Sequence, residues 1–287
     1  MEAAPPIVPA GTVIGRLQGP LTALDAFRDT ALIAPACHDT ASAIAGIGAD
    51  LSNSAYICSG TWSLVGTVVD TPITSRAAMN ARFTNQAAAA EGFCCHTNVN
   101  GMWLLKQCME GWSGAGRTWT IEDLIAQVGA CAAIPGVIDV DAEPLLLAGD
   151  MPARINQQLK LRGLAAIGDK PGNEAVFARV IFESLARRYA DALRSIESLV
   201  DRKFTRIHIL GGGSRNRLLT LLTHGTTGLQ IDSGEVESST IGNFAVQLAA
   251  AEGESGRLSA EAVRQWASRL CEKSQRPQAK TATPPTA

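Results

Sequence analysis

A histidine and an aspartate stand side by side in the small-residue stretch PACHDTASAIAG, residues 35–46. A carboxylate at an exposed loop end, such as that of Asp39, can accept the proton of a hydroxyl group as its oxygen attacks a phosphorus atom, which is the general-base role in phosphoryl transfer. Asp39 or Thr40 would equally suit a helix cap, because a short polar side chain there satisfies backbone amides without an intrahelical partner. Both interpretations predict a helix that begins here.

A Ser-Gly-Thr turn forms the second group of interest, within CSGTWSLVG at residues 58–66. Such a turn between two strands directs backbone amides and the hydroxyls of Ser59 and Thr61 to one point, which is what an anionic phosphoryl group requires. Taken alone, the segment also fits an ordinary hairpin turn.

Three consecutive glycines form the third group, in ILGGGSRNRLL at residues 209–219. Without side chains, Gly211, Gly212 and Gly213 let a ligand approach the backbone between a buried strand and a helix. The amides at the start of that helix suit a phosphate group, and Asn216 offers a cap. A purely structural tight turn remains the alternative.

An α/β architecture is predicted to hold these turns, because apolar strand-like runs alternate with helical patterns along most of the chain. Residues 54–70 contain two β-rich runs joined at the SGT turn, which predicts a hairpin. Residues 204–232 have the pattern of a buried strand, a glycine turn, a helix, a glycine stop and a strand. Further helices are predicted over 100–112, 120–130 and 259–270.

The clearest helix covers residues 173–200, where apolar residues recur every three or four positions and predict core packing. The opposite side of this helix carries charged residues, which we expect to form a solvated face. The apolar positions are Phe177, Ile181, Leu185, Tyr189, Leu193, Ile196 and Val200, and the charged ones are Arg179, Arg187, Arg188 and Asp191.

Composition excludes several classes of function. The chain has 287 residues, 46% of them hydrophobic, so it can bury a core, and its net charge of -2 without basic clusters favours small-molecule partners over nucleic acid. No apolar run reaches the length of about 18 residues that a membrane helix needs, and residues 1–11 have neither a basic start nor the apolar core of a signal peptide, so we expect a cytoplasmic protein. The seven cysteines lack C-x-x-C spacing, which favours reduced, mostly buried thiols and no metal site.

Five motifs follow one another along residues 5–252, and this succession resembles the C-terminal half of the FGGY carbohydrate kinases. The first two motifs are most similar to the rhamnulokinase branch of that family. Each motif alone is weak, and their common order makes the resemblance specific. In order they are HDTASA at 38–43, SGTWSLVG at 59–66, TNVNGMWLLKQ at 97–107, GGGSRN at 211–216 and EVESSTIGNFAVQLA at 235–249.

The resemblance implies an actin-like ATPase fold of ribonuclease H topology, in which two lobes close over a sugar and ATP. It implies ATP-dependent phosphorylation of a sugar, L-rhamnulose to its 1-phosphate, with ATP and Mg²⁺. The expected divisions are a remnant of an interlobe linker at 1–12, the C-terminal kinase domain at 13–271 and a disordered tail at 272–287. The proline- and threonine-rich composition of that tail independently favours disorder.

Site residues follow from the resemblance position by position. Asp39 matches the catalytic base, and His38, Thr40 and Asn98 match residues that contact the sugar. The positions that match ATP contacts or support them are Gly60, Thr61, Gly211, Gly212, Gly213 and Asn216.

Two positions depart from the family pattern. Gln86 and a run of alanines stand where the rhamnulokinase branch has an acidic, glycine-bearing turn. Lys106 stands where the family usually has a glutamine that contacts the nucleotide, so Lys106 is left out of the predicted site.

The resemblance covers a single lobe, whereas the other lobe of the family supplies the first phosphate loop, a magnesium-positioning carboxylate and much of the sugar pocket. We therefore expect the chain to need a separate N-terminal lobe for turnover. One alternative is a noncatalytic nucleotide-binding or regulatory remnant that dimerises through the surface left uncovered. Another is a kinase for a different ketose, such as xylulose.

Overall fold

The structure is a computed structural model of the chain, and it describes residues 6–129, 131, 134–168, 170–253 and 258–274. Within these residues the strands form a six-stranded sheet in the order β5-β6-β4-β3-β7-β8 and a two-stranded ribbon of β1 and β2. The strands are β1 Val13–Arg16, β2 Ala31–Ile33, β3 Ser54–Ser59, β4 Trp62–Val69, β5 Phe83–Ala87, β6 Phe93–Asn100, β7 Arg206–Leu210 and β8 Gln230–Ser233.

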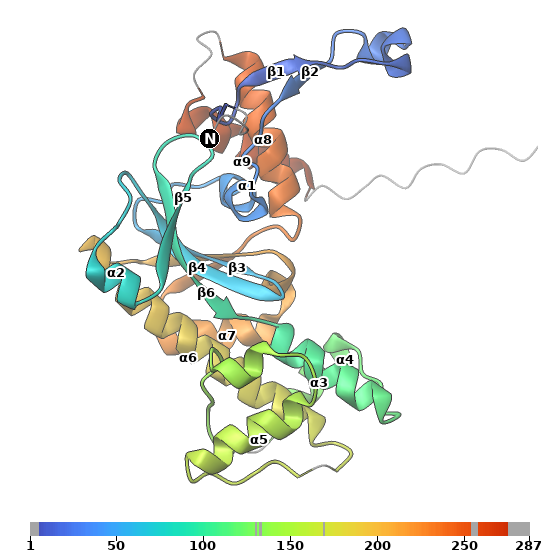
Figure 1. The fold of residues 1–287 in the computed structure, drawn as a ribbon, viewed down its shortest axis with the longest axis vertical. Coiled ribbons are helices and arrows are strands. Elements are labelled where there is room, and N and C mark those ends of the chain that lie inside the picture. Colours follow the sequence, from blue (N-terminus) through green and yellow to red (C-terminus); the bar gives the residue numbers. More distant parts are fainter. Residues whose placement is uncertain (1–5, 130, 132–133, 169, 254–257, 275–287) are drawn as a thin grey trace, which may run out of the picture.

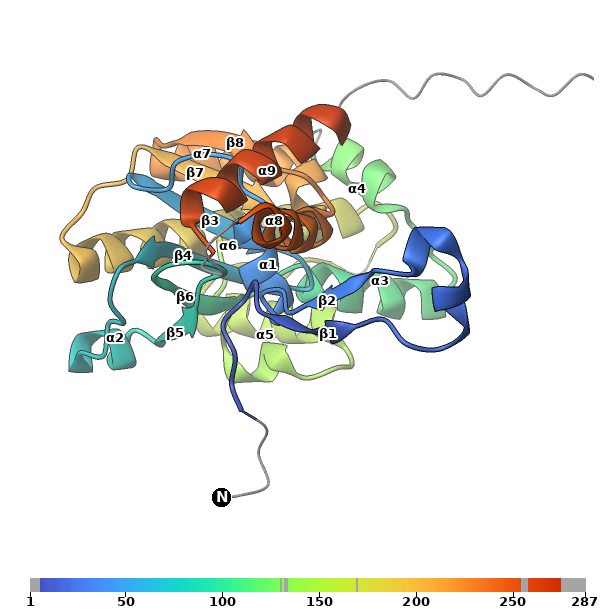
Figure 2. The same ribbon diagram turned by 90° about the horizontal axis from the view of Figure 1, so that it is seen from above.

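Helices cover both faces of the large sheet (Figures 1 and 2). The α-helices are α1 Asp39–Ala45, α2 Arg76–Asn80, α3 Trp103–Gly114, α4 Ile121–Val128, α5 Met151–Leu161, α6 Glu174–Val200, α7 Arg217–Thr227, α8 Ser238–Glu252 and α9 Ala260–Ser274. The predicted helices over 100–112, 120–130, 173–200 and 259–270 therefore exist, as do the hairpin and the strand–helix–strand unit.

The sheet is antiparallel on one side of β3 and parallel on the other. β4 pairs with β3 and β6, and β6 with β5, in antiparallel register, whereas β7 runs parallel to both β3 and β8. Strand side chains alternate between faces, so each strand contributes to two cores. Ile57 and Val65 face the long helix α6, and Tyr56 and Cys94 face α1 on the opposite side.

The apolar side of α6 forms most of the larger core, as its periodicity predicts. Six of its seven apolar positions are buried, and only Val200, in the last turn, is half-buried. The prediction of a solvated face is wrong for Arg179 and Arg188, two of the four charged residues on the other side of α6, because each is half-buried in an ion pair. Arg188 binds Asp141 with Nε and Oδ2 2.6 Å apart, and Arg179 binds Glu183. Arg187 and Asp191 are exposed, as expected.

Helices α1 and α8 cross at a contact between backbones. A Cβ atom on Gly242 would lie 1.7 Å from the carbonyl oxygen of Ser42, and one on Gly46 would lie 2.5 Å from that of Ser238. Each helix thus needs a glycine where it meets the other, and this close approach fixes the position of α1 over the sheet.

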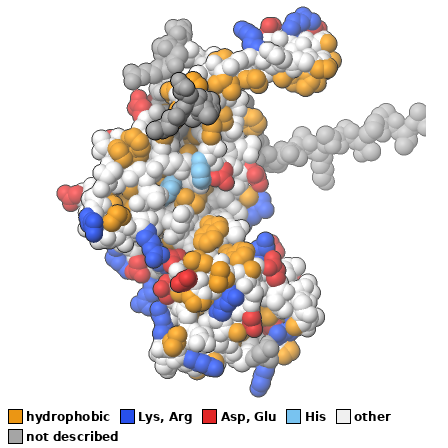
Figure 3. Space-filling view, in the orientation of Figure 1, with side chains coloured by type: hydrophobic (Ala, Val, Ile, Leu, Met, Phe, Trp, Pro, Cys, Tyr) orange, Lys and Arg blue, Asp and Glu red, His pale blue; other side chains and the backbone are white. Residues whose placement is uncertain are grey.

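The β1–β2 ribbon projects from one end of the molecule, beside α8 and α9 (Figures 1 and 3). Gly11, at the base of the ribbon, approaches the side chains of Leu258 and Ala250. The apolar side chains along the ribbon are open to solvent. A two-stranded ribbon is only marginally stable alone, and an exposed apolar patch of this kind marks an interaction surface. These exposed residues are Val13, Ile14, Leu21, Leu24, Phe27 and Leu32.

The two ends of the chain were predicted to lie outside the folded domain. Residues 6–12 form no regular element, and Gly11 donates from its amide to Ala34. The tail was predicted to begin at residue 272, but α9 continues to Ser274. The rest of the predicted tail, 275–287, lies outside the described residues. All seven cysteines are free thiols, of which Cys94, Cys95 and Cys108 are fully buried. Among the described helices, none has both the length and the apolar character to cross a bilayer.

Substitution of Gly242 tests the α1–α8 contact. Gly242→Ala places a methyl group against the Ser42 carbonyl and should lower the free energy of unfolding by at least about 2 kcal/mol in urea titrations. Gly225→Ala is the matched control, because Gly225 lies within α7 with open space around it; it should raise stability by about 0.5–1 kcal/mol. Equal effects of the two variants would contradict the close contact.

Candidate functional site

The start of α1 holds the first predicted site residues. His38 is the N-cap and accepts a hydrogen bond from the amide of Thr40 on Nδ1 at 3.2 Å. The prediction that Asp39 or Thr40 is the cap is therefore wrong, because the helix begins at Asp39. Asp39 Oδ1 shares the Thr40 amide at 2.7 Å, yet the Asp39 side chain is 85% exposed. The carboxylate is thus oriented by the helix start and still open to solvent.

Asn98 lies on the sheet face that α1 covers. Cys58 of β3 pairs with Leu64 of β4, and Leu64 pairs with Asn98 of β6, so the three side chains form one row across the sheet. Exposure increases along this row from the half-buried Cys58 to the exposed Asn98. Burial, then Cys94, then the carboxylate of Asp39 raise the pKa of the Cys58 thiol.

The SGT turn is joined directly to the start of α3. The amide of Met102 donates to the Gly60 carbonyl at 3.1 Å, and the amide of Trp103 donates to the Thr61 carbonyl at 3.0 Å. Between them, Gly101 lies so close that a Cβ atom would be 2.9 Å from both carbonyl oxygens. The side chain of Thr61 is exposed, so the turn presents its hydroxyl outward. The predicted hairpin is confirmed, and α3 sets the position of its tip.

The three glycines of the second turn have different surroundings. Gly211 has φ +78°, a left-handed conformation that favours glycine. A Cβ atom on Gly213 would lie 2.0 Å from Ser59 Oγ, so this residue packs against the end of β3. Gly212 has open space where a side chain would stand. Only Gly212 therefore exposes backbone to a ligand, while its two neighbours shape the turn.

Asn216 closes this turn and begins the next helix. Its Oδ1 accepts from the amide of Leu219 at 3.0 Å, which confirms the predicted cap of α7. Its Nδ2 atom is buried and has no hydrogen-bond partner among the residues that the structure describes. One donor at the GGG turn is therefore left for a ligand or a water molecule.

A cavity of about 480 Å³ opens beside Thr61, within the range of small-molecule sites. It lies between α3 and the segment that leads into α4, and most of its lining is apolar. Lys106, left out of the predicted site, lines it and pairs with Glu110, with Nζ and Oε1 3.8 Å apart. Sequence reasoning missed Lys106 as a neighbour of Thr61. The hydrogen bonds that join the SGT turn to the start of α3 bring these two residues together, although they are 45 positions apart in sequence. The lining residues are Thr61, Met102, Leu105, Lys106, Met109, Glu110, Ser113, Thr118, Trp119 and Ile121.

The GGG turn and the alanine run after Gln86 both lie outside this cavity. The lining includes neither the GGG turn nor Asn216, which adjoin the end of β3 instead. Of the alanines that follow Gln86, Ala88, Ala89 and Ala90 pack in the clusters beneath α1, α8 and α9. The alanine run therefore contributes packing.

His96 lies buried under α1 and shapes the electrostatics of this face. Its Nδ1 atom and the hydroxyl of Tyr56 lie 3.0 Å apart. Burial, and secondarily the nearby His38, lower the pKa of His96 to about 4. Burial also raises the pKa of Tyr56 well above its usual value. Both groups are neutral at pH 7, so the floor of the site carries no charge of its own.

The sequence profile of the C-terminal domain of the FGGY carbohydrate kinases matches residues 55–251. This chain belongs to the FGGY family. Among curated relatives of this FGGY domain, the rhamnulokinase of Enterobacter sp. (strain 638) is 34% identical over 238 residues, which cover 83% of this chain and 46% of the relative. The rhamnulokinase of Bacteroides thetaiotaomicron is 32% identical over 237 residues, or 83% of this chain and 47% of the relative. The FGGY chain thus spans about half the length of these relatives.

Solved structures share the fold of this FGGY domain. The xylulose kinase of Rhodospirillum rubrum superposes with a TM-score of 0.61 at 15% identity, over 92% of this chain and 51% of that one. The gluconate kinase of Lactobacillus acidophilus superposes with a TM-score of 0.64 at 18% identity, over 91% of this chain and 51% of that one. The predicted fold, the C-terminal lobe of an actin-like ATPase, is confirmed.

A metal cage of protein side chains would need several acidic, cysteine or histidine residues close together in the FGGY domain. Within the described ranges, no three of them gather closely enough to hold an ion. Magnesium in phosphoryl-transfer sites is usually held by substrate phosphates with one or two carboxylates, and this arrangement needs no such cage.

The low pKa of His96 predicts a pH-dependent stability. Unfolded, the side chain titrates near pH 6.5, and folded it titrates near 4, so acid protonates the unfolded state first. The free energy of unfolding should therefore fall by about 3 kcal/mol between pH 7 and pH 4 on this account. Urea titrations across this range measure it.

His96→Gln keeps a hydrogen-bond acceptor for Tyr56 and should weaken this pH dependence. The decrease that remains is expected from His208, because burial also lowers its pKa. His224→Gln, on an exposed position of α7, should leave the full decrease. A decrease as large in the His96 variant as in the parent would show that His96 titrates normally.

Proposed function

We propose that this chain is the C-terminal lobe of an ATP-dependent sugar kinase that converts L-rhamnulose to its 1-phosphate. Its identity to two rhamnulokinases over most of its own length favours this sugar over other ketoses such as xylulose. One structural observation carries the proposal: α1, which begins at the exposed carboxylate of Asp39, covers the sheet face on which the exposed Asn98 lies near the SGT turn.

In this proposal Asp39 removes the proton from the sugar hydroxyl as that oxygen attacks the terminal phosphate of ATP. His38 and Thr40 hold the Asp39 backbone through the cap, and Asn98 hydrogen-bonds the sugar. The neutral floor under α1 supports this role, because a fixed positive charge near Asp39 would make the carboxylate a weaker base.

The nucleotide lies, in this proposal, between the SGT turn and the GGG turn. Thr61, with the backbone at Gly60, contacts the phosphates, and the open backbone at Gly212 contacts the nucleoside. Gly211 and Gly213 shape the turn, and the unpaired Nδ2 of Asn216 supplies a donor. Lys106 joins the site in place of the family's glutamine, because a lysine beside Thr61 can reach a phosphate as a point charge. Magnesium would neutralise phosphate charge and arrives, in this proposal, with ATP.

A second lobe completes the catalyst in this proposal. Lobe closure is what brings both reactants together and excludes water, and one lobe offers neither. The exposed apolar side chains of the β1–β2 ribbon support a covering partner, since large exposed apolar patches mark interaction surfaces. We expect this partner to be an N-terminal kinase lobe; a second copy of the chain is the alternative.

The test combines the purified chain with a separately produced N-terminal half of the Enterobacter rhamnulokinase. Formation of ADP with L-rhamnulose, D-xylulose or no sugar measures activity and sugar preference. Calorimetry with ATP and Mg²⁺ on the chain alone measures nucleotide binding. ATP binding without turnover in any mixture would favour the noncatalytic regulatory remnant, and absence of both would refute the kinase proposal.

Asp39→Asn should lower kcat at least about 100-fold in the active mixture, because general-base catalysis contributes on this scale. ATP affinity and thermal stability should stay unchanged, since the side chain is exposed and an asparagine oxygen can still accept the Thr40 amide. Asp70→Asn is the control, because this exposed carboxylate lies beyond the opposite end of β4 from the SGT turn. Retention of normal kcat by the Asp39 variant would exclude it as the base.

A further inference from the structure

A second cavity, of about 340 Å³, lies along the middle of α6. It shares no residue with the cavity beside Thr61. Its walls are the loop at 137–140, the end of α5 and the middle of α6. Three of its nine lining residues are arginines, Arg162, Arg187 and Arg188, and the others are Val137, Ile138, Asp139, Val140, Ser184 and Asp191.

The three arginines keep most of their N–H donors free. Arg162 uses Nη1 for the Val137 carbonyl, at 3.0 Å, and Arg188 uses Nε for Asp141 Oδ2, at 2.6 Å. Arg187 is exposed and has no hydrogen-bond or ion-pair partner among the described residues. Because each guanidinium carries five N–H groups, every one of them has donors left to direct at a ligand.

The acidic side chains of the same walls are already engaged. Asp191 pairs with Arg194 on the next turn of α6, and Asp139 Oδ1 accepts the amide of Asp141 at 3.1 Å. The hydroxyl of Ser184 is also occupied, since it donates to the Val180 carbonyl and accepts the Ile138 amide. The lining carries three guanidinium groups against the two carboxylates of Asp139 and Asp191, so its charge is net positive.

We propose that this cavity binds a small phosphate-bearing anion. The planar forks of guanidinium groups match phosphate oxygens in pairs, and such charge-assisted hydrogen bonds are stronger than neutral ones. The cavity is of a size that takes a sugar phosphate or a pyrophosphate group. Macromolecules are not its occupants, because the arginines line an indentation between two helices and a loop rather than an extended surface.

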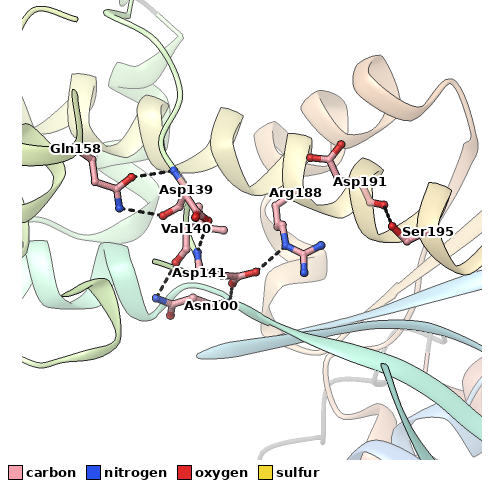
Figure 4. Close-up of polar contacts among 8 residues, drawn as sticks. All are labelled: Asn100, Asp139, Val140, Asp141, Gln158, Arg188, Asp191 and Ser195. Carbon is pink, nitrogen blue, oxygen red and sulfur yellow. Dashed lines mark hydrogen bonds and ion pairs between the residues drawn. The ribbon is translucent and has the colours of Figure 1, made fainter. Parts of the chain in front are cut away.

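Arg188 links this anion site through Asp141 to Asn100, the last residue of β6 (Figure 4). Asp141, which Arg188 holds with one carboxylate oxygen, accepts the backbone amide of Asn100 with the other at 2.8 Å. Asn100 in turn donates from Nδ2 to the Val140 and Leu145 carbonyls, and it directly precedes Gly101 under the turn. An anion on the free Nη groups of Arg188 offsets part of the positive charge that attracts Asp141 and so loosens this chain of contacts.

Occupancy of the anion site should therefore weaken nucleotide binding at Thr61. This second effect rests on the proposed function, because it assumes that ATP binds at the SGT turn. Coupling between two sites is reciprocal, so ATP should weaken anion binding by the same factor.

The experiment uses inorganic pyrophosphate as the probe, in magnesium-free buffer, with sodium chloride at matched ionic strength as the reference. Calorimetry and thermal unfolding measure its binding to the parent chain, Arg187→Gln, Arg187→Glu, Thr61→Ala and Arg76→Gln. Arg187 makes no contacts that its replacement would break, and Arg76, exposed at the start of α2, is the matched control.

We expect Arg187→Gln to weaken pyrophosphate binding at least about tenfold and Arg187→Glu to abolish it, since a charge-assisted pair is lost and then reversed. Arg76→Gln and Thr61→Ala should bind as the parent does. If Thr61→Ala lost pyrophosphate binding while both Arg187 variants bound as the parent does, the anion would be assigned to the SGT turn and the proposal would be overturned. No binding to the parent would also overturn it.

A second titration measures ATP with Mg²⁺ at saturating and at zero pyrophosphate. A several-fold weaker ATP affinity at saturation, absent in Arg187→Glu, supports the coupling. Unchanged ATP affinity would refute the coupling while leaving the anion site intact. Failure of ATP to bind at all would refute the proposed function and still leave pyrophosphate binding measurable, so the two outcomes are distinguishable.

Discussion

The close approach of the GGG turn to the end of β3 is the constraint on which the site depends. Gly211 and Gly213 bring backbone against Ser59, and the parallel pairing of β3 with β7 holds the two strand ends side by side. Any side chain at Gly213 would collide with Ser59 and separate the two turns. Because the SGT turn begins at Ser59, this contact fixes the distance between two turns that are about 150 residues apart in sequence.

A second set of close contacts places the carboxylate over the sheet. Gly242 and Gly46 let α1 and α8 cross at backbone distance, and α1 then covers Tyr56 and His96. Burial keeps His96 neutral, and the row of side chains across the sheet opens to solvent at Asn98. The exposed carboxylate thus stands at the start of the helix that covers this uncharged layer.

The chain belongs to the FGGY family and spans about half the length of the rhamnulokinases that it matches. The described lobe orients a carboxylate and joins two backbone turns, and its apolar ribbon remains open. The hydrogen bonds from Arg188 to Asp141 and from Asn100 to Asp141 link the long core helix α6 to the region beside the tip of the hairpin.

The sequence by itself determined which elements form and which residue types gather at turns. Periodicity predicted α6 over 173–200, and the observed helix is Glu174–Val200; alternation and a Ser-Gly-Thr turn predicted the β3–β4 hairpin. These features depend on neighbours along the chain, so local patterns reveal them. The order of five motifs further predicted the family and the fold.

Only the tertiary structure decided what each predicted residue contacts. It made His38 the cap instead of Asp39, divided the glycines into two that pack and one that is open, and brought Lys106 beside Thr61. It also turned Arg188 from an expected surface charge into the centre of a hydrogen-bond connection. Each of these outcomes depends on pairs of residues distant in sequence, and local propensity carries no information on which distant backbone will approach.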